Sequence, residues 1–318
     1  MPLTVTNHLP ADFLSAALRT DVLRGLTANP KWLPPKWFYD DRGSDLFEQI
    51  TRLPEYYPTR AERSILAERA AEIAAASGAD TLVELGAGSA DKTRLLLDTG
   101  TFRRYVPIDV SEGALRHAAT TILADYPGLT VHAVVADFEQ HLEKLPDGGR
   151  RLIAFLGGTI GNQVPEERAV FLRSVRATLR PGETLLLGTD LVKSPDVLVA
   201  AYDDSAGITA EFNKNVLHVV DRELKADFDP DEFAHVAIWD ADAEWIEMRL
   251  RSLRDQRVRI ELLNLDVSFA RGEEMRTEVS AKFRRDGVTA ELEAAGFDPD
   301  EWWTDREGRF GLSLSTAR

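Results

Sequence analysis

Short apolar runs alternate with longer segments of helical spacing through the middle of the chain. The runs that read as buried strands are residues 81–85, 104–110, 129–137, 151–156 and 184–190. Pro165 stands at a favoured first-turn position of a helix, and Thr59 and Glu62, ahead of the first run, have the spacing of a capping box. Alternation of this kind predicts βα units built on a parallel sheet.

The pattern changes after Lys193. A helical region covers residues 196–224, and strand-like segments follow around 235–239, 245–252 and 257–269. Short polar turns join these segments, which predicts an antiparallel insert. The last part of the chain returns to the earlier style, with a helix that stops at Gly296 and a closing hairpin of segments 301–304 and 310–315.

These patterns divide the chain into two predicted domains, in keeping with about 150 residues per domain. One comprises residues 60–193 and 283–318 and has an α/β, Rossmann-like sheet with a reversed last strand. The other comprises residues 1–59 and 194–282 and is an α+β domain. The first 55 or so residues are expected to be helical and loop-like and to pack with the insert.

Composition narrows the classes of function. The chain has 38 basic and 53 acidic side chains and a net charge of −15, which would repel a nucleic-acid backbone. It has no cysteine, and its 6 histidines lack metal-binding spacing, so no metal site is expected. No apolar run approaches the roughly 20 residues of a membrane span, and the start lacks a signal-peptide pattern. We therefore expect a cytoplasmic protein that binds neither nucleic acid nor membrane.

A glycine turn follows the first apolar run, in the sequence VELGAGSADKT. Such a turn lets backbone N–H groups and a helix N-terminus approach a ligand closely. A nucleoside-triphosphate loop needs a glycine directly before the lysine, but Asp91 precedes Lys92. Asp91 also replaces the third glycine of a dinucleotide fingerprint, where its charge would lie beside two phosphates. The sequence therefore disfavours both a nucleoside-triphosphate site and a dinucleotide site. A dinucleotide-dependent dehydrogenase is disfavoured for the same reason.

S-adenosylmethionine suits the remaining pattern, because it carries a sulfonium and an amino-acid tail but no phosphate. Asp109 closes the second predicted strand, about 20 residues beyond the turn, where an acid would accept hydrogen bonds from ribose hydroxyls. Asp137 and Phe138 close the third, and would offer an acceptor and an apolar wall to adenine. Each acid is also a plausible helix cap, but the set together favours a methyl-donor site. The turn itself is E-x-G-x-G, formed by Glu84, Gly86 and Gly88.

Several segments beyond the glycine turn resemble the histidine N-alpha-methyltransferases of ergothioneine biosynthesis. They are residues 33–60 (LPPKWFYDDRGSDLFEQITRLPEYYPTR), 155–162 (FLGGTIGN), 185–193 (LLLGTDLVK), 201–217 (AYDDSAGITAEFNKNVL) and 273–283 (EEMRTEVSAKF). The resemblance covers essentially the whole chain. It implies three transfers of methyl from S-adenosylmethionine to the α-amine of L-histidine, giving hercynine and S-adenosylhomocysteine. It also implies that the Rossmann-like domain is a class I methyltransferase sheet and that the other domain binds substrate.

The resemblance also implies roles for matching residues. Asn162 and Tyr202 would hold the substrate carboxylate, and Glu278 and Ser280 would hold the imidazole. The acceptor pocket would be lined or shaped by Tyr39, Phe47, Tyr56, Gly157 and Met248. The matching cofactor residues are Gly86, Lys92, Asp109, Asp137 and Phe138.

The residue types agree with this assignment. Glu278 and Ser280 are two apart, so on a strand both side chains point to one face, where they can bind the two nitrogens of an imidazole. A solvated strand face is the alternative for this pair, and a plain turn is the alternative for Asn162. Tyr56 and Asn162 are the residues expected to act in catalysis, with Tyr56 or water relaying the proton that the amine loses.

Two rival functions remain open from the sequence. One is a methyltransferase for another small amino acid or amine, since cofactor residues do not determine the acceptor. The other is a catalytically silent cofactor-binding protein. We expect a monomer in either case.

Overall fold

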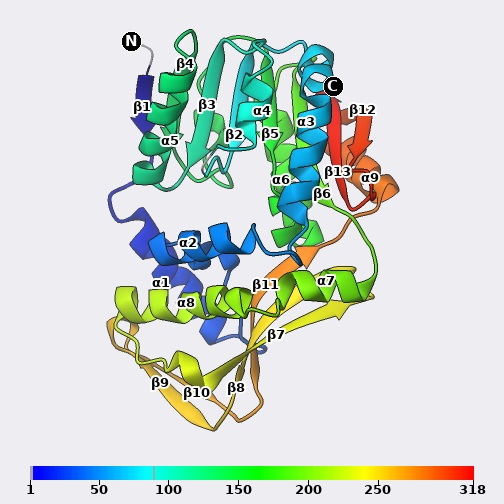
Figure 1. Cartoon of the computed structure of the whole chain (residues 1–318). Helices are drawn as coiled ribbons and strands as arrows, with labels where there is room; N and C mark the ends of the chain where they lie inside the picture. Colours follow the sequence, from blue (N-terminus) through cyan, green and yellow to red (C-terminus); the bar gives the residue numbers. More distant parts are fainter. Residues whose placement is uncertain (1–2, 89) are drawn as a thin grey trace. The chain divides into compact units, whose positions relative to one another are not determined.

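The computed structural model describes residues 3–88 and 90–318; Ser89 of the glycine turn lies outside them. The chain divides into two compact units. We call the first the sheet unit; it comprises Met1–Pro10, Pro58–Leu191 and Phe283–Arg318. The second, the insert unit, comprises Ala11–Tyr57 and Val192–Lys282. Figure 1 labels the elements of both.

The sheet unit contains an eight-stranded sheet in the order β1-β4-β3-β2-β5-β6-β13-β12. Strands β1 to β6 pair with one another in parallel, whereas β13 is antiparallel to β6 and to β12. This confirms the predicted Rossmann-like sheet with a reversed last strand. The strands are β1 (Leu3–Asn7), β2 (Thr81–Leu85), β3 (Arg104–Asp109), β4 (Thr130–Val135), β5 (Arg151–Phe155), β6 (Thr184–Asp190), β12 (Phe297–Thr304) and β13 (Phe310–Ala317).

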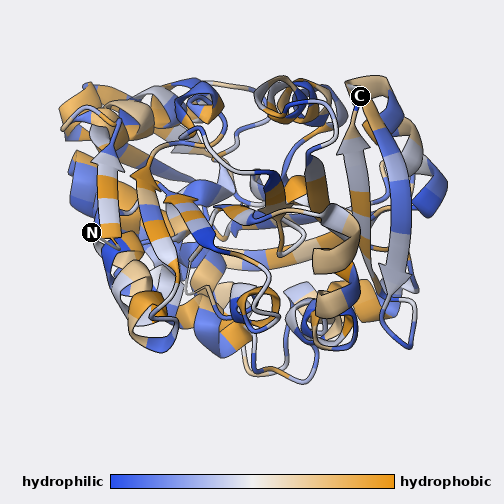
Figure 2. Cartoon of the chain, turned by 90° about the horizontal axis from the view of Figure 1, so that it is seen from above, coloured by the Kyte–Doolittle hydropathy of each residue, from blue (hydrophilic) through white to orange (hydrophobic). Residues whose placement is uncertain are grey.

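The helices of the sheet unit cover the sheet and bury its apolar strands. Figure 2 shows hydrophobic residues along the inner strands, while the edge strand β12 is largely hydrophilic and mostly exposed or half-buried. Helix α3 packs on α4, and α6 packs on α9. The helical segments are α3 (Pro58–Ser77), α4 (Thr93–Leu97), α5 (Glu112–Asp125), η2 (Leu142–Lys144), η3 (Thr159–Asn162), α6 (Pro165–Thr178) and α9 (Arg285–Ala295).

Strand β1 is a correction to the sequence analysis. Residues Leu3–Asn7 were expected to be helical or loop-like and to belong with residues 11–59, but they pair with β4 in parallel register, from Leu3 opposite Val131 to Asn7 opposite Val135. Residues 3–10 therefore belong to the sheet unit. Apolar and β-branched residues alternate in LTVTN, which suits a half-buried edge strand although no continuous apolar run marks it.

The insert unit has two small antiparallel sheets, β11-β8-β7 and β10-β9, as predicted for this region. The predicted segment 257–269 is two strands, because the chain reverses at η5 and at Asn264, which has a φ of 48°. The predicted helical region is likewise two helices, divided before Gly207, which has a φ of 74°. The helical segments are α1 (Phe13–Leu26), η1 (Pro35–Phe38), α2 (Asp41–Ile50), α7 (Pro195–Tyr202), α8 (Ile208–Leu224), η4 (Pro230–Glu232) and η5 (Glu261–Leu263). The strands are β7 (Phe233–Asp240), β8 (Trp245–Ser252), β9 (Gln256–Ile260), β10 (Leu265–Phe269) and β11 (Glu274–Ala281).

None of the helices in residues 3–88 and 90–318 combines the length and the apolar character that crossing a bilayer requires.

Candidate active site

The predicted cofactor residues gather at the carboxyl ends of the parallel strands β4, β3 and β2, and the predicted substrate residue Gly157 lies at the same end of the neighbouring strand β5. Glu84 is the penultimate residue of β2, and Asp109 is the last residue of β3. Asp137 and Phe138 follow β4, and Gly157 follows β5. Because open α/β sheets bind ligands at this edge, the strand order brings the predicted residues to the expected place.

The glycine turn has a backbone that favours glycine. Gly86 has a φ of 72° and Gly88 a φ of 48°, and both lie in the left-handed region. The Asp109 carboxylate joins this turn to the next helix, accepting from Gly88 N–H at 3.4 Å and from Ser111 N–H at 3.0 Å. Burial raises the pKa of Asp109, and these backbone bonds oppose the rise. Asp109 thus holds the glycine turn and the start of the next helix. Each of its oxygens keeps a lone pair that can accept a hydrogen bond from a ribose hydroxyl.

Glu84 lies inside the sheet unit and is 4% exposed. Its carboxylate accepts a hydrogen bond from the hydroxyl of Tyr105 on β3. Burial raises the pKa of Glu84 to about 7, although the Tyr105 hydroxyl and the Lys92 charge lower it. Burial therefore favours the neutral form of this carboxyl.

Glu62 is a member of this site that the sequence analysis assigned elsewhere. It is fully buried, and its carboxylate accepts from the Gly157 N–H at 2.8 and 3.0 Å and from the Lys92 ammonium at 2.5 Å. The capping-box prediction for Glu62 is wrong, because the side chain crosses to the end of β5 and does not return to the start of its own helix. Glu62 holds Lys92 and the Gly157 loop together.

The loop after β4 is held by its own hydrogen bonds. Asp137 accepts from Glu139 N–H at 2.9 Å and from the Gln140 side chain at 2.8 Å. The Phe138 ring lies edge-on to Phe155, with 5.4 Å between ring centroids. Phe138 is thereby fixed as an apolar wall beside Gly86, where an added Cβ would lie 3.5 Å from its ring.

The loop after β5 carries the two predicted substrate residues of the sheet unit. Gly157 and Gly158 have φ values of 81° and 70°, so the chain turns sharply before η3. Asn162 is the last residue of η3. The remaining predicted substrate residues all belong to the insert unit.

The insert unit brings its predicted aromatic residues into one cluster. Tyr39 lies edge-on to Phe47 at 5.5 Å between centroids, Phe47 to Tyr56 at 6.0 Å, and Tyr56 to Tyr202 at 6.5 Å. Phe212 of α8 contacts both Tyr39 and Phe47, at 5.3 and 5.8 Å. Phe212 was missed in the sequence analysis. In the sequence, its position on the apolar face of an amphipathic helix indicated burial but not membership of this cluster.

Strand β11 presents the predicted imidazole-binding residues beside Tyr202. Glu278 stands opposite Met248 of β8, after a bulge that follows Arg276. The Ser280 and Tyr202 hydroxyl oxygens are 2.7 Å apart. Glu278 and Ser280 therefore share a face of the strand, as their spacing predicted.

A buried lysine and a protonated tyrosine lie beside Glu278, Ser280 and Tyr202. Lys282 is 4% exposed, and its ammonium donates to Tyr202 at 2.9 Å and to Ser280 at 2.8 Å; this residue was missed in the sequence analysis. Tyr39 is 51% exposed as a whole residue, but desolvation at its hydroxyl, with the charges of Glu278 and Tyr202 nearby, raises the pKa of Tyr39. Tyr39 consequently keeps its proton at neutral pH.

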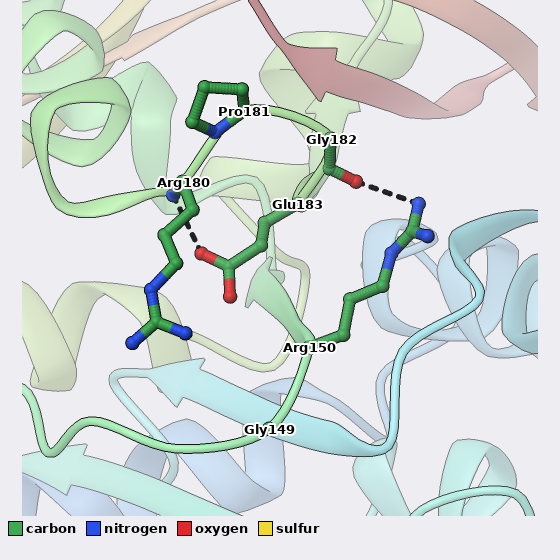
Figure 3. A pocket seen from close by; sticks show the side chains of 6 residues that line it. All are labelled: Gly149, Arg150, Arg180, Pro181, Gly182 and Glu183. Atoms are coloured by element: carbon green, nitrogen blue, oxygen red, sulfur yellow. Dashed lines mark hydrogen bonds between the residues drawn. The ribbon is translucent and has the colours of Figure 1, made fainter.

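A separate hollow in the sheet unit lies at the opposite edge of the sheet, before β5 and β6 (Figure 3). Arg150 donates to the Gly182 carbonyl at 2.7 Å, and Glu183 accepts from the Arg180 N–H at 2.7 Å. Burial opposes ionisation of Glu183, but bonds from Arg151 and Arg180 outweigh it and lower the pKa of Glu183. These pairings join the starts of the two strands. In the part of the chain that the structure describes, no cluster of acidic or histidine side chains could hold a metal ion.

The chain is similar in sequence to proteins named as methyltransferases of amino acids. The profile of the family described as "Histidine-specific methyltransferase, SAM-dependent" matches residues 18–317. A histidine N-alpha-methyltransferase of Mycolicibacterium smegmatis is 60% identical over 99% of both chains, and one of Mycobacterium tuberculosis is 57% identical over the same shares. An L-tryptophan methyltransferase of Psilocybe serbica is 28% identical, over 93% of this chain and 91% of its own. The chain therefore belongs to the family of histidine-specific, S-adenosylmethionine-dependent methyltransferases.

Proposed function

We propose that this protein transfers methyl groups from S-adenosylmethionine to the α-amine of L-histidine, three times in succession, giving hercynine for ergothioneine biosynthesis. The observation that carries the proposal is the 60% identity, over 99% of both chains, to a protein named histidine N-alpha-methyltransferase. The proposal is also supported by the residues that each unit brings together: the proposed cofactor residues lie in the sheet unit, and most of the proposed substrate residues lie in the insert unit.

The sheet unit has suitable residues for holding S-adenosylmethionine. Asp109 offers free lone pairs to the ribose hydroxyls, and Phe138 offers an apolar wall to adenine. The proposed cofactor residues are Glu84, Gly86, Gly88, Lys92, Asp109, Asp137 and Phe138. When bound, S-adenosylmethionine supplies a methyl group that its sulfonium charge already activates, so the main contribution of the protein is positioning.

Glu278 and Ser280 are proposed to bind the imidazole of histidine. A carboxylate accepts a hydrogen bond from one ring N–H, and a hydroxyl can donate to the other nitrogen. The Lys282 ammonium donates to the Ser280 oxygen at 2.8 Å, which leaves the hydrogen of the Ser280 hydroxyl for the ring nitrogen. An apolar acceptor side chain would leave these polar groups unpaired, which disfavours it strongly.

The other end of the substrate is proposed to be held by Asn162 and Tyr202, which bind its carboxylate. Holding both ends leaves the amine as the free nucleophile. Tyr39, Phe47 and Tyr56 would line the pocket, with Met248 and the small Gly157 shaping it. Aromatic faces attract a quaternary ammonium by about 0.5–2 kcal/mol each, which suits the trimethylated product.

The amine must lose a proton before each transfer. Tyr56 or a water molecule is proposed to relay that proton, with Asn162 keeping the amine aligned through the carboxylate. Tyr39 is unsuited to accept the proton as a phenolate, because its pKa is raised. Its hydroxyl instead remains a neutral hydrogen-bonding group.

The test is to incubate the protein with S-adenosylmethionine and L-histidine and to follow the products by mass spectrometry. We expect histidine to gain one, two and then three methyl groups. L-tryptophan and other amino acids serve as competing acceptors, since a relative at 28% identity is named for tryptophan. Methylation of another amino acid alone would favour the rival acceptor. Binding of S-adenosylmethionine without any product would favour a silent cofactor-binding protein.

We also propose that the enzyme acts as a monomer in the cytoplasm, where the metabolites that it uses would be present. The absence of cysteine supports the cytoplasm as the compartment. Sedimentation of the active protein at several concentrations tests the monomer, and a mass of two chains would contradict it.

A further inference from the structure

Gln163 follows Asn162 in the loop at the carboxyl end of β5, directly before α6. Gln163 is buried, with 8% of its surface exposed. Its backbone carbonyl accepts from the Arg168 guanidinium at 2.9 Å, and Arg168 in turn binds both oxygens of Glu291 at 3.0 and 2.8 Å. The backbone at Gln163 is therefore held firmly in place.

The orientation of the Gln163 side-chain amide follows from its neighbour. The nitrogen Nε2 donates to Glu139 Oε1 at 3.0 Å. Because a carboxylate only accepts hydrogen bonds, the reversed amide would set two acceptors against each other. The amide oxygen Oε1 consequently points away from Glu139. It is buried and has no hydrogen-bond partner among residues 3–88 and 90–318.

This oxygen differs from the other buried polar atoms without a partner in the described residues. Those are the hydroxyls of Thr93, Thr184, Thr209, Ser313 and Ser315. A hydroxyl can rotate its hydrogen toward a neighbour, whereas the Gln163 oxygen is an acceptor fixed in direction by the bond to Glu139. A buried acceptor without a donor is costly, so a donor supplied by a ligand is the natural partner.

The place of Gln163 indicates which donor that is. Glu139, which orients the amide, is adjacent to Phe138 and two residues beyond Asp137, the residues proposed for adenine. Phe138 also lies edge-on to Phe171 of α6, with 6.0 Å between centroids. Each oxygen of Asp137 accepts one bond from its own loop and keeps one lone pair, and because the 6-amino group of adenine carries two hydrogens, it can use a second acceptor beside Asp137.

We infer that Gln163 Oε1 accepts a hydrogen bond from the 6-amino group of the adenine ring. Gln163 thereby selects adenine over a purine that carries an oxygen at this position, because a 6-oxo group would face the amide oxygen as a second acceptor. This inference rests on the proposed function, in which the sheet unit binds S-adenosylmethionine.

The experiment measures binding of S-adenosylhomocysteine and of its 6-oxo counterpart, S-inosylhomocysteine, by calorimetry. The wild type should bind the adenine compound more tightly. Gln163→Leu should lower affinity for S-adenosylhomocysteine about tenfold and leave S-inosylhomocysteine within about twofold. Glu139→Gln, which frees the amide to reverse, should reduce the preference in the same direction. Gln49→Leu, an exposed glutamine of the insert unit, is the matched control and should leave the preference unchanged.

The outcomes separate the two levels of the argument. If the wild type binds neither compound, the proposed function fails. If the wild type binds S-adenosylhomocysteine but shows no preference between the purines, or if Gln163→Leu weakens both equally, the role of Gln163 is refuted while the proposed function stands. Gln163→Met, which keeps the side-chain length, replaces the leucine variant if that variant fails to fold.

Discussion

Replacing Glu84 with glutamine should change how the stability of the protein depends on pH. Glu84 is 4% exposed, and burial raises the pKa of its carboxyl to about 7. In the unfolded chain a glutamate has a pKa of about 4.3. Glutamine keeps the shape of the side chain and an oxygen that accepts from Tyr105, but it does not titrate.

The sign of the effect follows from proton binding. As pH rises from about 4.3 to about 7, the unfolded chain releases the Glu84 proton while the folded chain keeps it, so the folded state loses stability over this window. Above pH 7 both states are ionised and the loss is constant. The gap of about 2.7 between the two pKa values corresponds to about 4 kcal/mol, since each pH unit is worth about 1.4 kcal/mol, and about 3 kcal/mol of it falls between pH 4.5 and pH 8.

The assay is urea unfolding of the wild type and of Glu84→Gln between pH 4.5 and pH 8. The stability of the variant relative to the wild type should grow by about 3 kcal/mol across this range. Glu143→Gln, an exposed carboxylate of the same unit, is the control and should show no such trend. Equal pH dependence in the wild type and Glu84→Gln would refute the reasoning.

Three further outcomes are expected. Glu62→Leu should lower the free energy of unfolding, measured by urea denaturation, by about 3 kcal/mol, because it leaves the Gly157 N–H and the Lys92 charge without their acceptor. A loss below about 1 kcal/mol would contradict these contacts. Glu278→Ala should raise the KM for histidine about tenfold or more with unchanged affinity for S-adenosylmethionine, whereas Glu274→Ala on the same strand should change neither. Equal effects on both substrates would argue against an imidazole-binding role. Asp109→Ala should weaken S-adenosylmethionine binding about tenfold in calorimetry, and unchanged affinity would remove Asp109 from the ribose site.

The main sheet could be predicted where burial is complete. Strands β2 and β6 have the predicted bounds because every residue of each is buried, so that the apolar run and the strand coincide. Strand β1 was missed because polar residues interrupt it and its partner Val131 lies far along the chain. A spacing pattern alone carries no information about a partner at that distance.

The site was predictable in part. The two-residue period placed Glu278 and Ser280 on one face, whereas the roles of these residues came from the family resemblance. Glu62 shows why local spacing has limits: its position relative to Thr59 suits a capping box, but a fold that brings Gly157 close offers the carboxylate better donors. Gln163 had no signal in the sequence, because the bond to Glu139 that orients its amide joins residues 24 positions apart.

The aromatic cluster is assembled from both segments of the insert unit: Tyr39 and Phe47 come from residues 11–57, and Tyr202 and Phe212 come from residues 192–282. In the proposed function this cluster lines the acceptor pocket, so recombination between relatives that exchanged one segment alone would pair half of an old pocket with half of a new one. A new acceptor preference can therefore be inherited intact only when both pieces are exchanged together, across four junctions with the sheet unit.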